Sequence, residues 1–346
     1  MPQQIPADAP TPYSDPIILY GQTSVTPGSG SAPNTDALSN PDNLDMELLE
    51  VRWRIYANPT PTKLVSSLVA GMAIGVKFDL GSLAVVDADV PLSSFGTARD
   101  IDEPGFGTNL IYPDPTNVNI TTTPYSYRWR LKYPLLIPGG AVLTPVYSHL
   151  SQTPFPVTID TMYLCRQRPP GQRRPDKVKV PWVGSYNSTP FDNLAGQAAG
   201  QDFSSESDLY NPFDVPLEVS RLAGSCVLVE TILGVTQVIE WNGEHRFQLG
   251  QLRARSKRGN ELARASTPFN TLFPIEWRVW DIPQGWHLMP GEYYKTQLNV
   301  AAVSYTPATN QTGSVQFMVA MTGFREVPVA DFVSAAFAEP EPEGTP

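Results

Sequence analysis

The sequence predicts an all-β protein made of two sandwich domains in tandem, and three observations predict it. The chain has 346 residues, which is too long for one ordinary sandwich and suits two domains of roughly 100–170 residues each. It contains 36 Pro and 25 Gly, more than helices tolerate. Its apolar residues gather in runs of about 5–10 residues with a turn signal between most of them, which is typical of sandwiches and barrels.

The first 43 residues are mainly Pro, Ser, Gly, Asn and Asp, a composition that buries too little apolar surface to fold alone. We expect residues 1–43 to form a flexible N-terminal arm. Its one apolar patch is Ile17, Ile18, Leu19 and Tyr20, and a patch of this kind often becomes ordered only against a neighbouring subunit. These four residues are therefore candidate assembly contacts, with a plain disordered tail as the alternative.

Strand patterns and turn signals fill residues 44–168, the predicted first domain. The character of the chain changes at Pro169-Pro170-Gly171, and a low-complexity stretch follows, so residues 169–214 are predicted to be a linker. Strands return over residues 215–328, the predicted second domain. Residues 329–346 carry a Glu-Pro-Glu-Pro-Glu run and are predicted to be an acidic, Pro-rich tail, with a turn or two of helix near residues 331–337.

The two halves share an internal repeat. The first contains Thr123-Pro124-Tyr125, Trp129-Arg130-Leu131 and a run ending in Pro138-Gly139. The second contains Thr267-Pro268-Phe269, Trp277-Arg278-Val279 and a run ending in Pro290-Gly291. We expect each Trp to fill a core while the next residue, an Arg, faces outward, because successive strand residues point to opposite faces. Each Pro-Gly is expected to form a tight turn, with shared turn chemistry by chance as the alternative to duplication.

The net charge is −10, so the general surface is poorly suited to binding nucleic acid. Six of the 24 basic residues form one cluster, and a second, smaller cluster lies within residues 253–258. The first cluster could pair with acidic neighbours, but we expect it to form subunit contacts or a membrane-facing base. A solvated face and a nucleic-acid contact are the remaining alternatives. The first cluster consists of Arg166, Arg168, Arg173, Arg174, Lys177 and Lys179, of which Arg173, Arg174, Lys177 and Lys179 are the candidate assembly contacts.

Catalytic and metal-binding motifs are absent from the sequence. The three His have no metal-type spacing, and neither G-x-S-x-G nor a Walker motif occurs. Asp87-Ala88-Asp89 and Asp100-Ile101-Asp102-Glu103 have the oxygen ligands that calcium needs, but we interpret them as solvated loop carboxylates. Cys165 and Cys226 are expected to be buried thiols, although sequence leaves a disulfide open. We expect no enzyme, no cofactor and no resident metal.

Two tandem sandwiches, a Pro-rich arm and a low charge content together resemble the double-jelly-roll major capsid proteins of icosahedral, membrane-containing bacteriophages. The resemblance covers about residues 44–328 and rests on architecture. It implies two eight-stranded jelly rolls side by side and three chains forming a pseudo-hexagonal unit that tiles a shell. It also implies that an internal membrane separates the shell from the genome, so a basic genome-binding arm is not needed.

The leading functional hypothesis is therefore a structural virion protein that self-assembles as trimers into an icosahedral capsid. Its expected partners are further copies of itself, other virion proteins and the headgroups of an internal membrane, with no specific nucleic-acid sequence. The start of the chain, Met1-Pro2-Gln3-Gln4, does not resemble a signal peptide, so we expect synthesis in the host cytoplasm. The alternatives are a minor capsid or spike protein of a virion, or a carbohydrate-binding β-sandwich protein.

Overall fold

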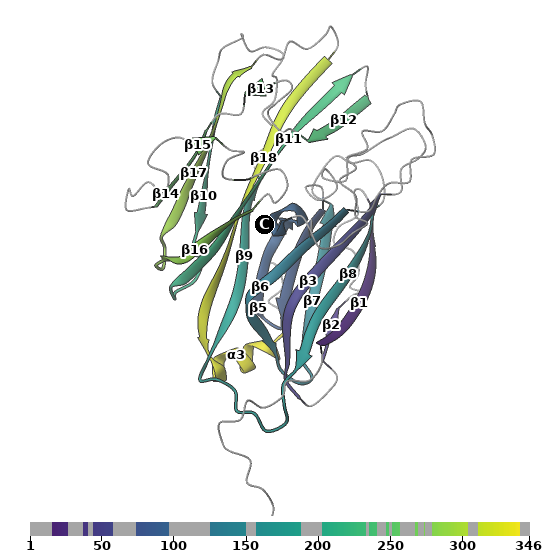
Figure 1. The fold of residues 1–346 in the computed structure, drawn as a ribbon, viewed down its shortest axis with the longest axis vertical. Coiled ribbons are helices and arrows are strands. Elements are labelled where there is room, and N and C mark those ends of the chain that lie inside the picture. Colours follow the sequence, from purple (N-terminus) through teal and green to yellow (C-terminus); the bar gives the residue numbers. More distant parts are fainter. Residues whose placement is uncertain are drawn as a thin grey trace, which may run out of the picture.

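The described residues of this computed structural model form strands in three sheets, and no helix among them is long and apolar enough to cross a membrane. The strands run roughly along the length of the molecule (Figure 1). The described residues are 16–26, 37–40, 44–57, 74–96, 125–149, 157–187, 203–232, 235–240, 247–248, 251–256, 267–268, 273, 279–303 and 311–339.

The first eight strands form one sandwich. One sheet has the order β1-β8-β3-β6, and the strands that face it have the order β2-β7-β4-β5. With the strands lettered B to I in chain order, these are the B-I-D-G and C-H-E-F sheets of a jelly roll. The strands are β1 (Pro16–Val25), β2 (Leu38–Ser39), β3 (Met46–Ala57), β4 (Ile74–Leu80), β5 (Leu83–Pro91), β6 (Tyr125–Ile137), β7 (Val142–His149) and β8 (Val157–Gln167).

The second half repeats this topology. Its two sheets have the orders β9-β18-β11-β16 and β10-β17-β14-β15, again B-I-D-G and C-H-E-F. The predicted fold class, two tandem eight-stranded jelly rolls, is confirmed. The elements are β9 (Lys177–Asn187), β10 (Phe203–Tyr210), β11 (Leu217–Ile232), β14 (Gln251–Ser256), β15 (Thr267–Pro268), β16 (Val279–Leu288), β17 (Tyr293–Val303) and β18 (Gln311–Pro328), with the accessory β12 (Val235–Glu240) and β13 (Phe247–Gln248), the 3-10 helix η1 (Leu92–Phe95) and helix α3 (Val329–Ala336).

The boundaries of the two rolls differ from the predicted ones. Strands β1 and β2 lie inside the stretch predicted as an arm, and β9 and β10 lie inside the predicted linker. Strand β1 has the two-residue alternation of a half-buried strand, with Gly21, Thr23 and Val25 inward, but small and polar inward residues disguise it. The polar β10 is held by its antiparallel pairing with β17 along its whole length. The connection between the rolls is therefore only residues 168–176.

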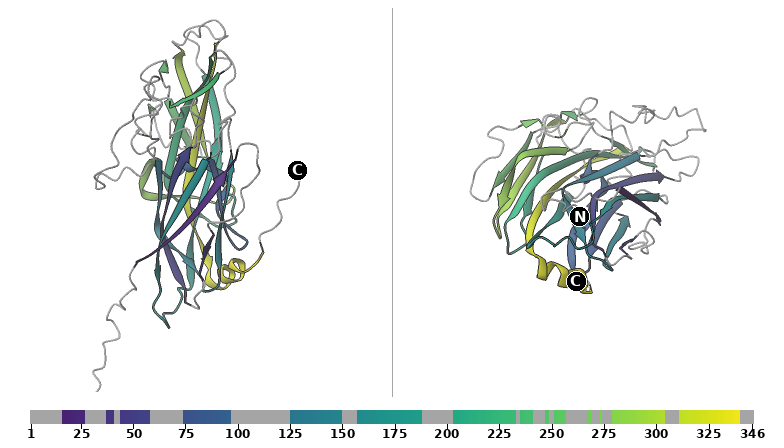
Figure 2. Two further views of the ribbon diagram at one scale, coloured as in Figure 1. Left: turned by 90° about the vertical axis from the view of Figure 1, so that its right-hand side faces the viewer. Right: turned by 60° about the horizontal axis from the view of Figure 1, so that its bottom comes forward.

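One nine-stranded sheet belongs to both rolls. Strand β5 of the first roll lies parallel to β9 of the second and pairs with it at Val86 and Val183. Both strands run in the same direction, so the two rolls point the same way. Figure 1 shows β9 and β5 adjacent where the two halves meet, and the second view in Figure 2 shows the rolls side by side.

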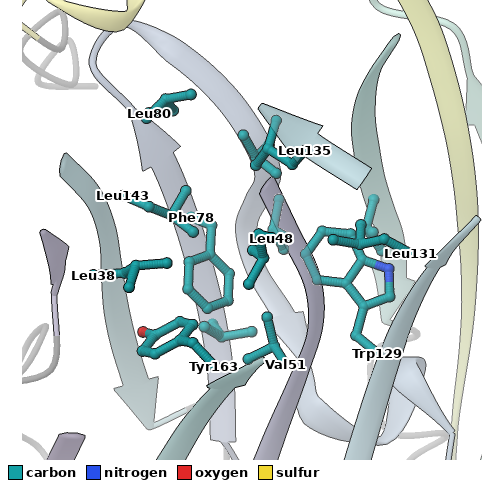
Figure 3. Close-up of a cluster of buried hydrophobic side chains, with 14 of the residues drawn as sticks. Leu38, Leu48, Val51, Phe78, Leu80, Trp129, Leu131, Leu135, Leu143 and Tyr163 are labelled. Atoms are coloured by element: carbon teal, nitrogen blue, oxygen red, sulfur yellow. The ribbon is translucent and has the colours of Figure 1, made fainter. Parts of the chain in front are cut away.

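Aromatic rings from both sheets fill the core of the first roll. The rings of Trp53 and Phe95 lie 4.7 Å apart, and those of Phe95 and Trp129 lie 5.3 Å apart. Phe78 meets Tyr163 edge-on at 6.5 Å. Figure 3 shows Phe78, Tyr163 and Trp129 among aliphatic side chains from the facing strands. Trp129 is buried and its neighbour Arg130 is exposed, as the alternation predicts.

The tight turns predicted from the repeat are present at residues 138–141 and 289–292. In each, the amide of the fourth residue donates to the carbonyl oxygen of the first, at 3.0 and 2.9 Å. The third residues, Gly140 and Gly291, have φ of 84° and 70°, so both are type II turns. Pro290 occupies the second position, as predicted, whereas the Pro of the first turn sits one position earlier. At this turn, the structural alignment of the two halves is therefore shifted by one residue from the alignment proposed from the sequence.

A buried asparagine holds the first of these turns. The side-chain amide of Asn40 donates to the carbonyl oxygens of Leu44 (2.9 Å) and Ile137 (3.0 Å). The backbone of the same residue exchanges hydrogen bonds with Ala141 (3.2 Å) and Gly140 (2.7 Å). One side chain thus joins the end of β2, the start of β3 and the turn between β6 and β7.

The second roll repeats this arrangement with Asn211. Its side-chain amide donates to the carbonyl oxygens of Val215 (2.9 Å) and Leu288 (3.0 Å). Its backbone amide donates to the carbonyl oxygen of Glu292 (2.9 Å). The same partners recur at the same places, so the two rolls are structural repeats of one another down to individual hydrogen bonds.

Helix α3 follows β18 directly and closes the base of the first roll. Phe332 and Ala336 are buried in the first roll's core. The carbonyl oxygen of Ala335 accepts a hydrogen bond from the amide of Ser82 at 2.9 Å, in the turn between β4 and β5. Gly81 in that turn has φ of 59°, and a Cβ there would overlap the Ala335 carbonyl.

We predict that Asn40→Ala and Asn211→Ala each lower the free energy of unfolding by about 1–3 kcal/mol, because each leaves one buried and one part-buried carbonyl oxygen without its donor. The Asp variants should be less stable than the Ala variants at neutral pH, since a carboxylate oxygen would then face those carbonyl oxygens. Urea unfolding measures both. Equal stability of the Asp and Asn proteins would contradict the assigned donor role.

We predict that Gly81→Ala destabilises the protein by about 1–3 kcal/mol more than Gly171→Ala does. Both glycines have positive φ, 59° and 76°, so both substitutions carry the cost of that backbone conformation. Only at Gly81 does the added methyl meet another element, because nothing lies within 4 Å of the Cβ position at Gly171. Thermal and urea unfolding of the two variants give the difference, and similar losses would show that α3 is not tightly docked.

Candidate assembly surfaces

The four basic residues predicted as assembly contacts lie on the connection from β8 to β9 and on β9 itself. Each of them forms an ion pair with a carboxylate of its own chain. Pairing with acidic neighbours was one of the alternatives that the sequence left open. The pairs are Arg173–Asp176 at 3.2 Å, Arg174–Asp45 at 2.6 Å, Lys177–Glu326 at 3.4 Å and Lys179–Glu218 at 3.2 Å.

The Arg174–Asp45 pair ties the connection between the rolls to the start of β3. Two guanidinium nitrogens of Arg174 donate to the two carboxylate oxygens of Asp45, at 2.6 and 2.7 Å, in the bidentate geometry that Arg favours. Burial alone would raise the pKa of Asp45, but the hydrogen bond and charge of Arg174 outweigh burial and hold the pKa below its ordinary value. This carboxylate therefore stays ionised and keeps its partner.

Lys179 belongs to a polar junction between the rolls, centred on Glu218 of β11. From the first roll, Lys132 donates to Glu218 at 2.8 Å and the hydroxyl of Tyr133 donates at 3.3 Å. Lys179 donates from β9 at 3.2 Å and lies 3.8 Å above the Tyr133 ring. Phe324 packs edge-on against that ring at 5.0 Å. The junction thus couples a strand of one roll to three strands of the other.

The charges of this junction stabilise one another. Burial alone would raise the pKa of Glu218, but Lys132 and Lys179 outweigh it and lower the pKa. The hydrogen bond to Glu218 raises the pKa of Lys132, against a smaller opposite effect of burial. All three groups stay charged at neutral pH, so the junction is a structural contact and leaves Lys179 engaged inside the chain.

The other predicted contacts, Ile17 to Tyr20, lie in strand β1 and not in an arm. β1 pairs antiparallel with β8 and forms one edge of its sheet. Ile17 and Leu19 are half-buried on the inner side, while Ile18 and Tyr20 are 64% and 65% exposed on the outer side. The Tyr20 hydroxyl donates to Asp160 of β8 at 2.7 Å. Two of the four candidates therefore remain available to a partner.

The same outer surface carries a group of arginines that sequence reasoning missed. Arg52 on β3 lies opposite Arg128 on β6, and Glu50 on β3 lies opposite Arg130. Arg54 follows on the same face of β3, opposite Ser126. Glu50 forms ion pairs with Arg52, with Arg128 at 2.8 Å and with Arg130 at 3.4 Å. It is 2% exposed, whereas the side chain of Arg130 is 69% exposed. We call these five residues the arginine face.

The charge of Glu50 is held by its neighbours. Burial alone would raise the pKa of its carboxyl group, but the hydrogen bonds and charges of Arg52 and Arg128 outweigh burial and lower the pKa. The carboxylate therefore stays ionised and fixes the guanidinium groups around it. The sequence signal for this face was a repeated triplet, Arg52-Trp53-Arg54 and Arg128-Trp129-Arg130, in which the Trp points into the core and the flanking arginines point out.

The remaining candidates for chemistry are scattered. Over the described residues, no three His, Cys, Asp or Glu side chains gather as a metal site would require. Asp87 and Asp89 are exposed on β5, and His287 is exposed on β16. Cys165 is a free buried thiol whose pKa burial raises to about 12. The side chain of Cys226, and the acidic run at residues 100–103, lie outside the described residues.

Comparison with known proteins finds likeness in solved structures alone. No protein-family model and no curated protein matches the chain. The crystal structure of PBCV-1 VP54, fitted into a reconstruction of the virophage Sputnik, matches with a TM-score of 0.44 and 9% identity over 92% of this chain and 95% of that one. The mavirus major capsid protein matches at 0.34 and 9%, over 93% and 89% of the two chains. The Faustovirus major capsid protein matches at 0.36 and 10%, over 94% and 93%.

We predict that Glu218→Gln makes the free energy of unfolding depend less steeply on pH between pH 7 and pH 3. A lowered pKa means that Glu218 contributes stability above its unfolded value of about 4.5, and that this contribution is lost as pH falls through the folded pKa. Urea unfolding at several pH values from 7 to 3 should show the variant less stable at pH 7 and its deficit shrinking toward pH 3. Glu326→Gln, which changes an exposed pair, is the control and should track the unmodified protein. A pH-independent deficit in Glu218→Gln would contradict the assignment.

Proposed function

We propose that this chain is a structural virion protein, the major capsid protein of an icosahedral virus, and that its activity is self-assembly. The observation that carries the proposal is the presence of two complete jelly rolls, joined in parallel orientation into one body by a shared sheet. A protein built to bind a small ligand needs one such sandwich. A protein built to tile a surface benefits from two similar ones held at a fixed angle.

Threefold symmetry would make a six-sided building unit from this chain. Three copies of a doubled roll around a threefold axis present six similar rolls, and a six-sided unit packs in a near-hexagonal lattice. This requires that the two rolls of one chain do not rotate against each other. The shared sheet, the Glu218 junction and the docking of α3 beneath the first roll all oppose such rotation. We infer a homotrimer as the assembly unit, located in the capsid of the virion.

The exposed basic residues at the base of the molecule suit an inward-facing role. Arg173 and Lys177 lie on or beside the connection between the rolls, and their carboxylate partners, Asp176 and Glu326, are also well exposed. Exposed ion pairs contribute little free energy, so anionic headgroups of an internal membrane compete readily for these two cations. Headgroups and other virion proteins are therefore the partners that we propose at this end.

We predict that the purified chain sediments and scatters light as a trimer, at three times its mass of 37.9 kDa. Raising the protein concentration or changing the salt should convert trimers to much larger particles, which electron microscopy would show as shells or sheets. A trimer that never forms larger particles would favour a minor capsid or spike protein. A strict monomer under every condition would contradict the proposal, and a glycan-binding screen would then test the carbohydrate-binding alternative.

A further inference from the structure

We propose that the arginine face, together with Ile18 and Tyr20 beside it, binds a second copy of this chain in a head-to-tail contact. The inference rests on the proposed function, because it names the surface through which the trimer closes. The partner surface is an acidic region elsewhere on the neighbouring copy.

The register of the sheet makes this surface continuous. The row that contains Ile18 runs through Leu164 of β8 to Glu50 and Arg130. The next row contains Tyr20, Met162, Arg52 and Arg128, side by side across the same four strands. Apart from Glu50, every member of these two rows is exposed or half-buried. Arg, Tyr and Met are the residue types enriched at protein interfaces, whereas an ordinary solvated sheet face carries more Lys and Glu.

The charge of this surface is opposite to that of the rest of the molecule. Four arginines against the carboxylates of Glu50 and Asp160 give it two net positive charges. The whole chain carries −10, so the remainder carries −12. Two arginine faces would repel each other across a twofold axis. A head-to-tail contact instead sets the basic surface of one copy against an acidic surface of the next, and such contacts close into rings when the rotation is 120°.

The buried carboxylate of Glu50 orders the neighbouring arginine side chains before a partner binds. Arg52 and Arg128 are held by Glu50 in the free chain, so they lose less side-chain freedom when a partner arrives. Arg130, at 69% exposure, is positioned by the same carboxylate and still reaches solvent. A pre-ordered set of guanidinium groups suits the planar, bidentate recognition of carboxylates.

The size of the sheet is adequate for a specific contact. Strands of about ten residues at ~3.4 Å per residue, four of them ~4.8 Å apart, give a face of roughly 35 Å by 19 Å. That is about 650 Å², close to the roughly 800 Å² that each partner buries in a standard interface. Ile18 and Tyr20 supply apolar anchors at one border of the face and the arginines supply specificity across the rest.

The test is a double variant, Ile18→Glu with Arg130→Gln, which makes the face more negative by two charges. Arg52 and Arg128 remain to neutralise Glu50, so the fold should persist. The matched control is Met289→Glu with Tyr210→Glu, which makes the same charge change at two exposed residues of the second roll that lie outside the face. Light scattering across a concentration series measures trimer dissociation, and thermal unfolding reports the fold of each protein.

We expect the face variant to raise the dissociation constant of the trimer at least tenfold, with the control and the unmodified chain remaining trimeric. If the unmodified chain is a trimer and the face variant dissociates no more than the control does, the inference is overturned while the proposed function stands. If the unmodified chain is monomeric throughout, the proposed function itself fails. Should the double variant unfold at a lower temperature than the control, Ile18→Ser alone, which alters one exposed side chain, tests the same contact through the same measurement.

Discussion

The parallel contact between β5 and β9 makes one sheet from halves of two sandwiches, and the rest of the structure depends on it. Because the sheet continues from one roll to the other, the first roll is not closed by its own strands alone. Val178, Val180 and Val183 of β9 lie in the buried cluster of the first roll. The second roll therefore supplies part of the core that its neighbour needs, and neither can turn without breaking apolar contacts and backbone hydrogen bonds together.

Helix α3, the last described element of the chain, also packs against the first roll. The first roll begins near the N-terminus, but Phe332 and Ala336 of α3 complete its core. The amide of Val329 also donates to the carbonyl oxygen of Asp176, at the end of the connection between the rolls (3.0 Å). Contacts of this sequence separation form late, since loop-closure entropy opposes them until other contacts have formed. We infer that the first roll reaches its final packing after the last helix of the chain is available.

The sequence predicted the fold class, the duplication and the turn chemistry, because those depend on local patterns. It did not predict the limits of the rolls. Strand β1 hides its alternation behind Gly21 and Thr23 on the inner side, and β10 has an unbroken polar run in its middle, from Ser204 to Asp208. These strands are defined by backbone hydrogen bonds to β8 and β17, whose paired residues lie between 83 and 150 positions away in the sequence, and a partner that distant leaves little local trace. One further local pattern in the sequence also marks the repeat. Asn40-Pro41 and Asn211-Pro212 stand at corresponding places, each four residues before the residue whose carbonyl the Asn side chain binds. An Asn-Pro pair is an ordinary turn signal, and only the structure shows that the amide reaches a second turn far along the chain.

The proposed contact surface was harder to predict than the fold, because residues that are distant in the sequence bring its charges together in space. The sequence predicts subunit contacts at the basic cluster of residues 166–179. In the structure, the four candidate residues of this cluster form ion pairs with carboxylates of the same chain. Arg52 and Arg130 are 78 positions apart in the sequence and become neighbours only through the register of β3 and β6. The strand pattern Arg-Trp-Arg serves both purposes at once, because the Trp is buried in the core of the sandwich and the arginines on either side give the outer surface its charge. A core substitution at Trp53 or Trp129 would therefore disturb the arginine face as well as the fold, since the same strand backbone positions both.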